Sequence, residues 1–209
     1  MGSRRLPGKT LMKIQNRSIL ERAISRLRAS TAVDTVVVLT TRCKKDDAIV
    51  NECERLDVHF YRGPEEDVLA RFYEASEIFK PEIVIRATAD NPLIEIGSIE
   101  RIVAALRAFN LDYCMETGLP YGAATEAITA TALAETHAAA REPRHREHVT
   151  LYTRERQDKF RVLLLDPPLA ERHPDLRVTV DTPEDFAAME QLISRFPEAD
   201  VPRPLKDYY

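Results

Sequence analysis

The feature that most constrains this fold is a regular alternation of short, β-branched apolar runs with longer amphipathic segments. Residues 33–39 (VDTVVVL) are rich in valine and bounded by Ser and Thr, which is typical of a strand buried in a parallel sheet. Residues 18–27 repeat apolar side chains at helical spacing, and Ser18 and Glu21 stand three positions apart, as in a capping box. The same two patterns predict further strands at residues 58–61, 82–88, 111–115, 160–165 and 176–180, and further helices at residues 45–56, 65–79, 98–109, 131–141, 144–154 and 183–195.

This alternation predicts the fold class. Strands that alternate with helices of about 10–15 residues favour an α/β fold, a doubly wound and mainly parallel sheet with helices on both faces. We expect a single domain over residues 1–209, with a small inserted lobe around residues 113–143, where the alternation becomes irregular. Because ligands of such sheets bind beyond the carboxyl ends of the strands, we expect the chemistry to lie in the loops that follow them.

Size and composition exclude several classes of protein. A chain of 209 residues is long enough to bury a core without disulfides or a structural metal. A formal net charge of −4 argues against nucleic-acid or anionic-lipid partners, and no apolar run approaches the roughly 18 residues that a membrane span needs. The three cysteines include no Cys-x-x-Cys pair, which argues against a disulfide framework or a thiolate zinc site. We therefore expect a protein of the reducing cytoplasm with a small-molecule ligand.

The charge is concentrated at the start of the chain, where residues 1–20 carry five basic side chains and no acidic one. Two of the six glycines fall within residues 2–9 (GSRRLPGK), together with Arg5 and Lys9. Glycine lets the backbone approach an anion closely, backbone N–H groups donate to phosphate oxygens, and Arg and Lys add charged hydrogen bonds. These residues predict a phosphate-binding loop without the Walker spacing; the alternative is a solvated basic terminus.

Two aspartates follow apolar strands. Asp90 lies in RATADNPL and Asp181 in RVTVDTPED, each at the carboxyl end of a predicted strand. Hard cations are bound at such positions in α/β nucleotide enzymes, so the two carboxylates together predict one Mg²⁺ held jointly with substrate phosphates. The alternative is local capping, which explains Thr182 ahead of a helix that begins with Pro183, and which would also explain Asp90, but not Asp181.

Five stretches of the chain carry a family resemblance. They read GSRRLPGKTLMKI, RGPEEDVLARFYEA, VIRATADNPLIE, REHVTLYTRE and RVTVDTPEDF, and together they span nearly the whole sequence. In order and spacing they resemble the cytidylyltransferase family of the spore coat polysaccharide protein SpsF, which is related to CMP-KDO and CMP-sialate synthetases. The resemblance implies transfer of CMP from CTP to a sugar or sugar acid, with release of pyrophosphate and assistance by Mg²⁺, in surface polysaccharide or glycan biosynthesis. It also implies a homodimer.

The resemblance assigns roles to residues by position. Arg5 and Lys9 are the catalytic pair, which holds the triphosphate and stabilises the leaving pyrophosphate, while Asp90 and Asp181 bind Mg²⁺. The nucleotide-binding set is Ser3, Arg5, Gly8, Lys9, Asp67, Arg71 and Thr88, and the residues for acceptor binding or a subunit interface are Arg146, His148 and Glu126. A lone histidine such as His148 in a predicted helix is more often structural than catalytic.

This chain departs from its relatives at three places. Relatives read GDCP where this chain has ADNP at residues 89–92, which preserves the aspartate. They carry an acid where this chain has Ala124, so either acceptor specificity differs or acceptor turnover is lost. They also place an apolar strand before the phosphate loop, whereas this chain begins inside the loop. We therefore expect the first strand of the sheet to be missing, and we expect Met1 to be an internal methionine of a longer product.

Two rival functions stay open. Another sugar nucleotidyltransferase, or a glycosyltransferase that uses a sugar nucleotide, has similar architecture, because a fold does not determine the reaction. A truncated, non-catalytic domain that binds a nucleotide or a partner would account for the missing strand and for Ala124. The presence of Lys9, Asp90 and Asp181 favours an enzyme, because a purely structural role does not need them.

Overall fold

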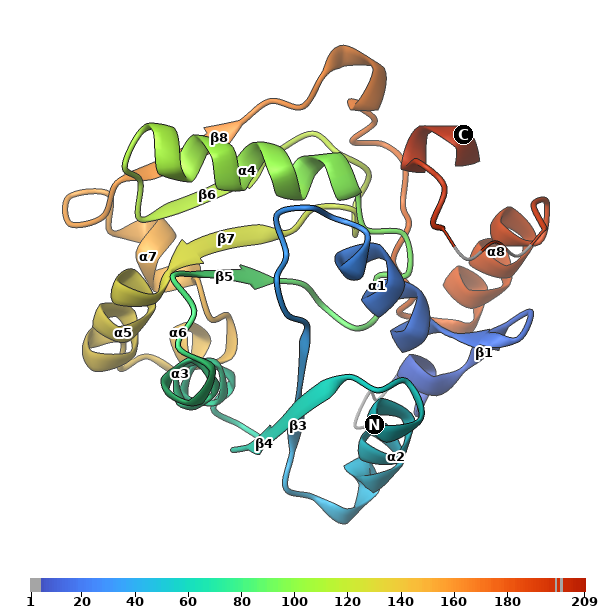
Figure 1. Ribbon diagram of the computed structural model, residues 1–209, viewed down its shortest axis with the longest axis horizontal. Coiled ribbons are helices and arrows are strands. Elements are labelled where there is room, and N and C mark those ends of the chain that lie inside the picture. The colour runs from blue at the N-terminus through green and yellow to red at the C-terminus, as the bar shows by residue number, and fades with distance from the viewer. Residues whose placement is uncertain (1–4, 198, 200) are drawn as a thin grey trace.

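The computed structural model describes residues 5–197, 199 and 201–209. In this part of the chain the strands form an antiparallel pair β1–β2, a parallel pair β3–β4 and a four-stranded sheet in the order β5-β7-β6-β8 (Figure 1). The strands span Lys13–Ile14 (β1), Arg17–Ser18 (β2), Val37–Thr41 (β3), His59–Gly63 (β4), Ile83–Arg86 (β5), Tyr113–Glu116 (β6), Glu126–Thr129 (β7) and Val162–Leu165 (β8).

The four-stranded sheet is mixed. β6 and β8 run parallel, but β7 lies antiparallel between β5 and β6. β7 was not predicted, because its four residues (EAIT) contain no apolar run. The α/β class is confirmed, with parallel pairs β3–β4 and β6–β8. The region in which we expect a lobe, residues 113–143, contributes two strands to this sheet, and the irregular part of it is the connection at residues 117–125.

The helices begin where the sequence supplies caps. The Ser18 hydroxyl accepts a 3.0 Å hydrogen bond from the Glu21 N–H at the start of α1, and Thr182 and Asp185 form a capping box at the start of α8. No helix in the described residues is long and apolar enough to cross a membrane. The α-helices span Ile19–Arg28 (α1), Asp47–Arg55 (α2), Val68–Phe79 (α3), Ile96–Ala108 (α4), Ala130–Ala139 (α5), Pro143–Glu147 (α6), Leu151–Glu155 (α7) and Pro183–Ile193 (α8), and 3-10 helices span Lys9–Leu11 (η1), Lys44–Asp46 (η2), Leu169–Glu171 (η3) and Leu205–Tyr208 (η4).

Two predicted elements were wrong. The single helix at residues 144–154 is broken into α6 and α7, because the backbone leaves the helical region at His148 (φ −100°, ψ 65°) and the next residue, Val149, is fully buried in the core. Residues 176–180 do not form a strand. Arg177 makes an isolated parallel bridge with Tyr121, and beyond it the backbone N–H of Val180 pairs with a different loop.

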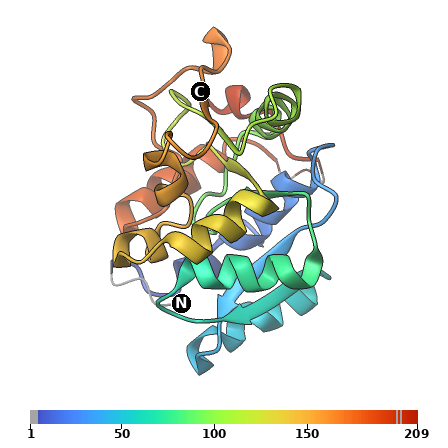
Figure 2. The same ribbon diagram turned by 90° about the vertical axis from the view of Figure 1, so that its left-hand side faces the viewer.

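Adjacent residues of the central strands face opposite layers of helices, as a doubly wound sheet requires. Ile128 of β7 packs with Leu69 of α3 and Leu133 of α5, whereas its neighbour Ala127 packs with Ile102 of α4. Figure 1 shows α4 across one face of the sheet, and Figure 2 shows α3 and α5 side by side on the other. Each large aliphatic side chain buried in this way stabilises the fold by about 1.5–3 kcal/mol.

A separate apolar cluster joins the two ends of the chain. Ile14 of β1 and Ile19 of α1 pack with Val178, Val180 and Met189, all of them nearly inaccessible to solvent. This packing holds the basic segment at residues 5–9 against the loop that carries Asp181, although the two are far apart in sequence.

Candidate active site

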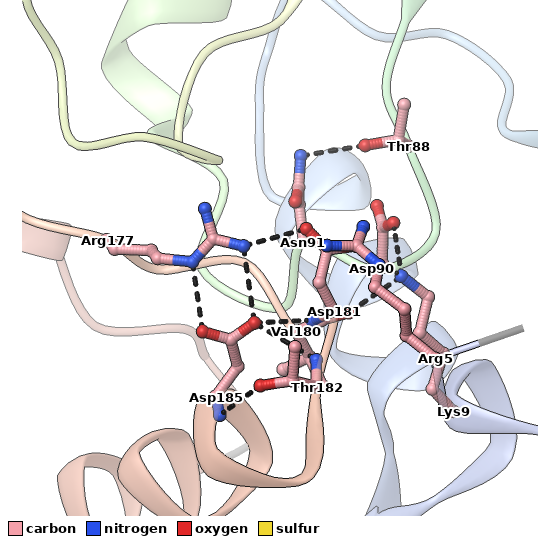
Figure 3. A network of polar contacts seen from close by, with 10 residues as sticks. All are labelled: Arg5, Lys9, Thr88, Asp90, Asn91, Arg177, Val180, Asp181, Thr182 and Asp185. Atoms are coloured by element: carbon pink, nitrogen blue, oxygen red, sulfur yellow. Dashed lines mark hydrogen bonds and ion pairs between the residues drawn. The ribbon is translucent and has the colours of Figure 1, made fainter. Parts of the chain in front are cut away.

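The ammonium group of Lys9 lies between two carboxylates (Figure 3). Its Nζ atom donates to Asp90 Oδ2 at 2.7 Å, to Asp181 Oδ1 at 2.8 Å and to the backbone oxygen of Val180 at 2.8 Å. Asp90 is 81 residues and Asp181 is 172 residues away from Lys9 in the sequence. Burial by itself lowers the pKa of Lys9, but the hydrogen bonds and charges of Asp181 and Asp90 outweigh it, so the pKa is raised above its ordinary value. Lys9 is therefore a firmly charged cation in a partly desolvated position.

The loop before Lys9 turns on a glycine. Gly8 has a φ of +73°, in the left-handed region that glycine adopts without strain, and its carbonyl accepts from Leu11 N–H at 2.9 Å as η1 begins. This turn directs the Lys9 side chain away from the apolar cluster and toward the aspartates. The predicted phosphate loop is thus ordered around Gly8 and Lys9; Ser3, the third residue predicted there, lies outside the described residues.

The loops that carry the two aspartates are joined through their backbones. The Val180 N–H donates to the backbone carbonyl of Asp90 at 2.9 Å. This hydrogen bond holds the two loops side by side. After β5 the chain turns at Thr88, whose hydroxyl accepts from the Asn91 side chain at 2.8 Å. Thr88, predicted to bind nucleotide, therefore shapes the turn that presents Asp90 (Figure 3).

Asp181 is held from its other side by Arg177. The guanidinium group donates to Asp181 Oδ2 at 2.7 Å and to Asp185 Oδ1 at 2.9 Å (Figure 3). Hydrogen bonding from Lys9, ahead of the contribution of Arg177, lowers the pKa of Asp181, while Arg177 lowers the pKa of Asp185 to about 2. Both carboxyl groups are therefore ionised at neutral pH.

Arg5 is a third cation at Asp181. Its Nη2 atom lies 3.0 Å from Asp181 Oδ1, and its side chain is 64% exposed. Exposure leaves the guanidinium group free to turn toward a bound anion, because an exposed ion pair contributes only about 0–1 kcal/mol. Arg5 and Lys9, the predicted catalytic pair, are thus brought together on the aspartates that were predicted to bind metal.

Gly122 packs closely against the two loops that carry the aspartates. At this residue φ is +99°, and an added Cβ would lie 2.7 Å from Thr179 Cβ and 3.1 Å from Asn91 Oδ1. Glycine is therefore required here both by conformation and by space. The neighbouring Ala124 packs against the apolar cluster instead of presenting a carboxylate.

Two more predicted residues form a second contact. Asp67 caps α3 by accepting from the Ala70 N–H at 2.8 Å, and its other oxygen accepts from Arg146 Nε at 2.9 Å. Arg71 donates to the backbone oxygens of Pro64 and Glu65, both at 3.0 Å, and burial lowers its pKa. The structure thus brings Asp67 and Arg146 together, whereas the sequence assigned them to different ligands, and gives Arg71 a role in holding the loop before α3.

The remaining predicted residues lie elsewhere in the fold. Glu126 lies on β7 with a side chain 12% exposed, and its Oε2 atom is 3.3 Å from Arg86 Nη1. His148 is exposed at the end of α6. The neighbouring His145 is instead buried, with its Nε2 atom 2.9 Å from Glu155 Oε2.

The Asp90–Asp181 pair suits a hard cation. The described residues contain no group of three or more His, Cys, Asp or Glu side chains that could cage a metal ion. Mg²⁺ does not need one, since it is commonly bound through one or two carboxylates together with substrate phosphates and water. Here two carboxylate oxygens already converge on one cation, the Lys9 ammonium group, so the donor set fits a magnesium ion completed by phosphate.

Sequence reasoning missed Arg177. It precedes Asp181 by four residues in an extended segment, where such a spacing does not predict a contact. The exposed ring of Tyr121 lies under its guanidinium group, with 4.9 Å between the guanidinium carbon and the ring centre. Only the tertiary placement of residues 121 and 177 on neighbouring chain segments identifies it.

Solved structures with this fold are nucleotidyltransferases. A cytidylyltransferase from Leptospira borgpetersenii serovar Hardjo-bovis matches 100% of this chain and 88% of its own, with a TM-score of 0.90 and 28% identity. A CMP:2-keto-3-deoxy-manno-octonic acid synthetase, solved in complex with CTP, matches 93% of this chain and 95% of its own with a TM-score of 0.68; at 16% identity this is a likeness of fold. The fold is therefore one that nucleotidyltransferases adopt.

Sequence comparisons narrow this class. A family model described as cytidylyltransferase matches residues 1–208. An uncharacterized protein of Methanocaldococcus jannaschii is 40% identical over 195 residues, which cover 93% of this chain and 80% of that protein. The spore coat polysaccharide biosynthesis protein SpsF of Bacillus subtilis is 33% identical over 200 residues, 93% of this chain and 83% of SpsF. The chain belongs to the cytidylyltransferase family, and the resemblance seen in the sequence is confirmed.

Proposed function

We propose that this protein transfers CMP from CTP to a hydroxyl group of a sugar or sugar acid and releases pyrophosphate. Membership of the cytidylyltransferase family supports the nucleotide. The observation that carries the proposal is the convergence of Lys9 on Asp90 and Asp181, because a cation beside two carboxylates is what a triphosphate and its metal ion require.

Lys9 and Arg5 provide the charge for the phosphates. Lys9 lies between the two aspartates, and its flexible four-carbon stem lets the ammonium group turn to a phosphate oxygen when CTP binds. Arg5 lies beside it on the solvent side and can bind two phosphate oxygens through its planar guanidinium group. Ser3 and the backbone at Gly8 complete this proposed loop.

Asp90 and Asp181 are the proposed ligands of Mg²⁺. When bound, the ion polarises the α-phosphate and neutralises charge on the leaving pyrophosphate. Arg177 then keeps Asp181 ionised and fixed in orientation, since it holds the oxygen that Lys9 does not use.

The chemical step is an in-line displacement. A hydroxyl oxygen of the acceptor forms a bond to the α-phosphorus of CTP as the bond from that phosphorus to the bridging oxygen breaks. Pyrophosphate leaves with the electron pair, and the hydroxyl proton is released. Lys9 and Arg5 stabilise the negative charge that grows on the bridging oxygen.

A sugar acceptor is supported by the relatives. The matched protein of Bacillus subtilis is described as acting in spore coat polysaccharide biosynthesis, and a 3-deoxy-manno-octulosonate cytidylyltransferase of Hydrogenovibrio crunogenus is 28% identical over 55% of this chain. Arg146, His148 and Glu126 stay the proposed acceptor or interface residues.

We also propose a cytoplasmic location, which the free thiols of all three cysteines support. The proposed homodimer can be tested by sedimentation.

The test is a pyrophosphate-release assay with CTP, UTP, ATP or GTP, with and without Mg²⁺, over a panel of sugars and sugar acids. We expect release with CTP and Mg²⁺ only, and a loss of at least about 100-fold in Asp90→Asn, with no loss in the exposed control Asp175→Asn. Preference for another nucleotide would support a different nucleotidyltransferase. Nucleotide binding without release over the whole panel would support the non-catalytic alternative.

A further inference from the structure

The outer edge of β8 has no strand beside it among the described residues. β8 ends the strand order β5-β7-β6-β8 and pairs only with β6 (Figure 1). Its sequence is Val-Leu-Leu-Leu, with no charged residue and no proline. Natural sheets protect an exposed edge with charges, prolines or bulges, because its free N–H and C=O groups otherwise pair with another chain. Within its length β8 carries neither charge nor proline, so this edge is open to pairing.

β4, the outer strand of the β3–β4 pair, differs from β8. Its five residues include His59 and Arg62, and Pro64 follows directly after the strand. Charged side chains and proline are the usual protection of an edge. The apolar composition of β8 is therefore not shared by that edge strand, and it favours a partner that covers β8.

Alternate residues of β8 direct their backbone groups to the free edge. The Tyr113 N–H donates to the Arg161 carbonyl at 3.2 Å, and the Thr117 N–H donates to the Leu165 carbonyl at 2.8 Å. The backbone groups of residues 161, 163 and 165 therefore face β6, and those of Val162 and Leu164 face the opposite way. Val162 and Leu164 thus offer two N–H donors and two C=O acceptors to a further strand.

Exposed apolar side chains accompany this edge. Leu164 is 47% exposed, although it belongs to a strand of the sheet. Leu169 follows β8 by four residues and is 86% exposed. Phe109, which is 66% exposed, precedes β6 by four residues, and the first residue of β6 pairs with the first residue of β8. Apolar surface is therefore available on the strand and beyond both of its ends.

The two ends of β8 carry opposite charges. Arg161 precedes the strand and Asp166 follows it, with side chains 54% and 69% exposed. Each has an exposed partner in its own chain, Asp112 at 3.2 Å from Arg161 and Arg172 at 3.6 Å from Asp166. Exposed ion pairs of this kind are weak, so both charges can also interact with another chain. If two β8 strands lie antiparallel, the basic end of each comes beside the acidic end of the other.

We propose that β8 is a dimer interface, in which the free edge of β8 pairs antiparallel with β8 of a second copy of this chain. The same edge serves both copies about a two-fold axis, as in other isologous contacts. The register that sets the outward backbone groups opposite one another pairs Val162 of each copy with Leu164 of the other. Leu169 of each copy then lies toward the end of the interface where Phe109 of the other copy is found. This proposal rests on the homodimer in the proposed function and assigns its surface.

Sedimentation equilibrium of three proteins tests the interface: the 209-residue chain, Leu164→Lys and the matched control Ile78→Lys. Leu164→Lys puts a charge on the edge, whereas Ile78 is 61% exposed on α3. We expect the original chain and Ile78→Lys to form dimers of equal strength, and the dimer of Leu164→Lys to be weaker by at least about tenfold. Unchanged dimerisation of Leu164→Lys would overturn the β8 interface alone. A monomeric original chain would overturn the homodimer as well, whereas CMP transfer is tested separately by pyrophosphate release.

Amide hydrogen exchange in the original chain distinguishes strand pairing from other association. Dilution below the dissociation constant should speed exchange at Val162 and Leu164 by at least about tenfold, but not at Leu163 and Leu165, whose amides face β6 within each copy. Protection of Val162 and Leu164 that does not change with protein concentration would mean that the chain itself covers this edge, and would overturn the proposal. Free exchange at both amides in the dimer would assign the contact to another surface and would overturn it too.

Discussion

Replacing Lys9 with methionine removes the cation that Asp90 and Asp181 share, while a side chain of nearly the same length remains. Both carboxylate oxygens lie within 2.8 Å of Lys9 Nζ, so they are at most twice that distance, about 5.6 Å, apart. Two like charges at about 5.6 Å repel by about 3 kcal/mol at an effective dielectric constant of about 20. Arg5 and Arg177 remain beside Asp181 and offset part of this repulsion, so the variant should lose about 2–3 kcal/mol of stability at neutral pH.

The pH dependence follows from the direction of the pKa shifts. In the original protein Lys9 lowers the pKa of Asp181, so the stability from this contact is present above about pH 4 and is lost as the pH falls through the lowered pKa. In Lys9→Met the repulsion between the two carboxylates favours their protonation in the folded protein. The penalty is then largest at neutral pH and shrinks as the pH falls and the carboxyl groups take up protons. The stabilities of the two proteins should therefore diverge at neutral pH and converge in acid.

Urea unfolding from pH 3.5 to 8 measures the free energies, and NMR of the side-chain carboxyl carbons measures the pKa values. Millimolar Mg²⁺ should restore more stability to Lys9→Met than to the original protein, because a divalent cation replaces the missing charge. The matched control is Lys13→Met, since Lys13 is exposed on β1. A loss below about 0.5 kcal/mol at pH 7, with unchanged carboxyl pKa values, would refute the shared-cation geometry.

Three smaller predictions test other parts of the structure. Gly122→Ala should destabilise by about 1–3 kcal/mol in thermal unfolding, because its Cβ would meet Thr179 at 2.7 Å at a φ of +99°. Gly97→Ala should cost less, because the backbone there is helical and the added Cβ meets side-chain atoms of Arg101 and Glu95 instead of backbone. Asp185→Asn should remove the stability that depends on a pKa of about 2, so its difference from the original protein should be largest above about pH 4 and shrink as the pH falls toward 2. In the folded protein at pH 8, iodoacetamide should label Cys43 alone in mass spectra, since burial raises the pKa of the two other thiols to about 11; equal labelling of all three would contradict their burial.

Local pattern predicted most helices of this fold to within a few residues. The start of α1 at Ser18 and the start of α8 at Thr182 follow from capping residues whose partners stand three positions away. The local sequence pattern failed to predict elements whose bounds depend on contacts with residues far away in the sequence. The predicted helix at residues 144–154 is interrupted at His148, and Val149 after it is buried in a core cluster with residues from distant parts of the chain, which no neighbouring residue signals.

The strands show the same division. The valine-rich run predicted β3 although its bounds shifted by a few residues, because five successive apolar or β-branched residues suit a covered sheet. β7 gave no comparable signal, since Glu126 is polar and Ala127 is small, yet it occupies the middle of the sheet. Its place depends on pairing with β5 and β6, both of which lie elsewhere in the chain.

The sequence by itself determined the class of fold, the basic loop at Lys9 and the position of Asp90 after an apolar run, because each depends on residues a few positions apart. Only the tertiary structure decided that Lys9 bridges Asp90 and Asp181 and that Arg177 holds Asp181 from the other side. Those contacts require the packing of residues 14 and 19 against residues 178 and 180, which brings the two ends of the chain together. A side chain at residue 9 has no local interaction that selects partners 81 and 172 residues away; the closed apolar cluster beneath them makes that selection.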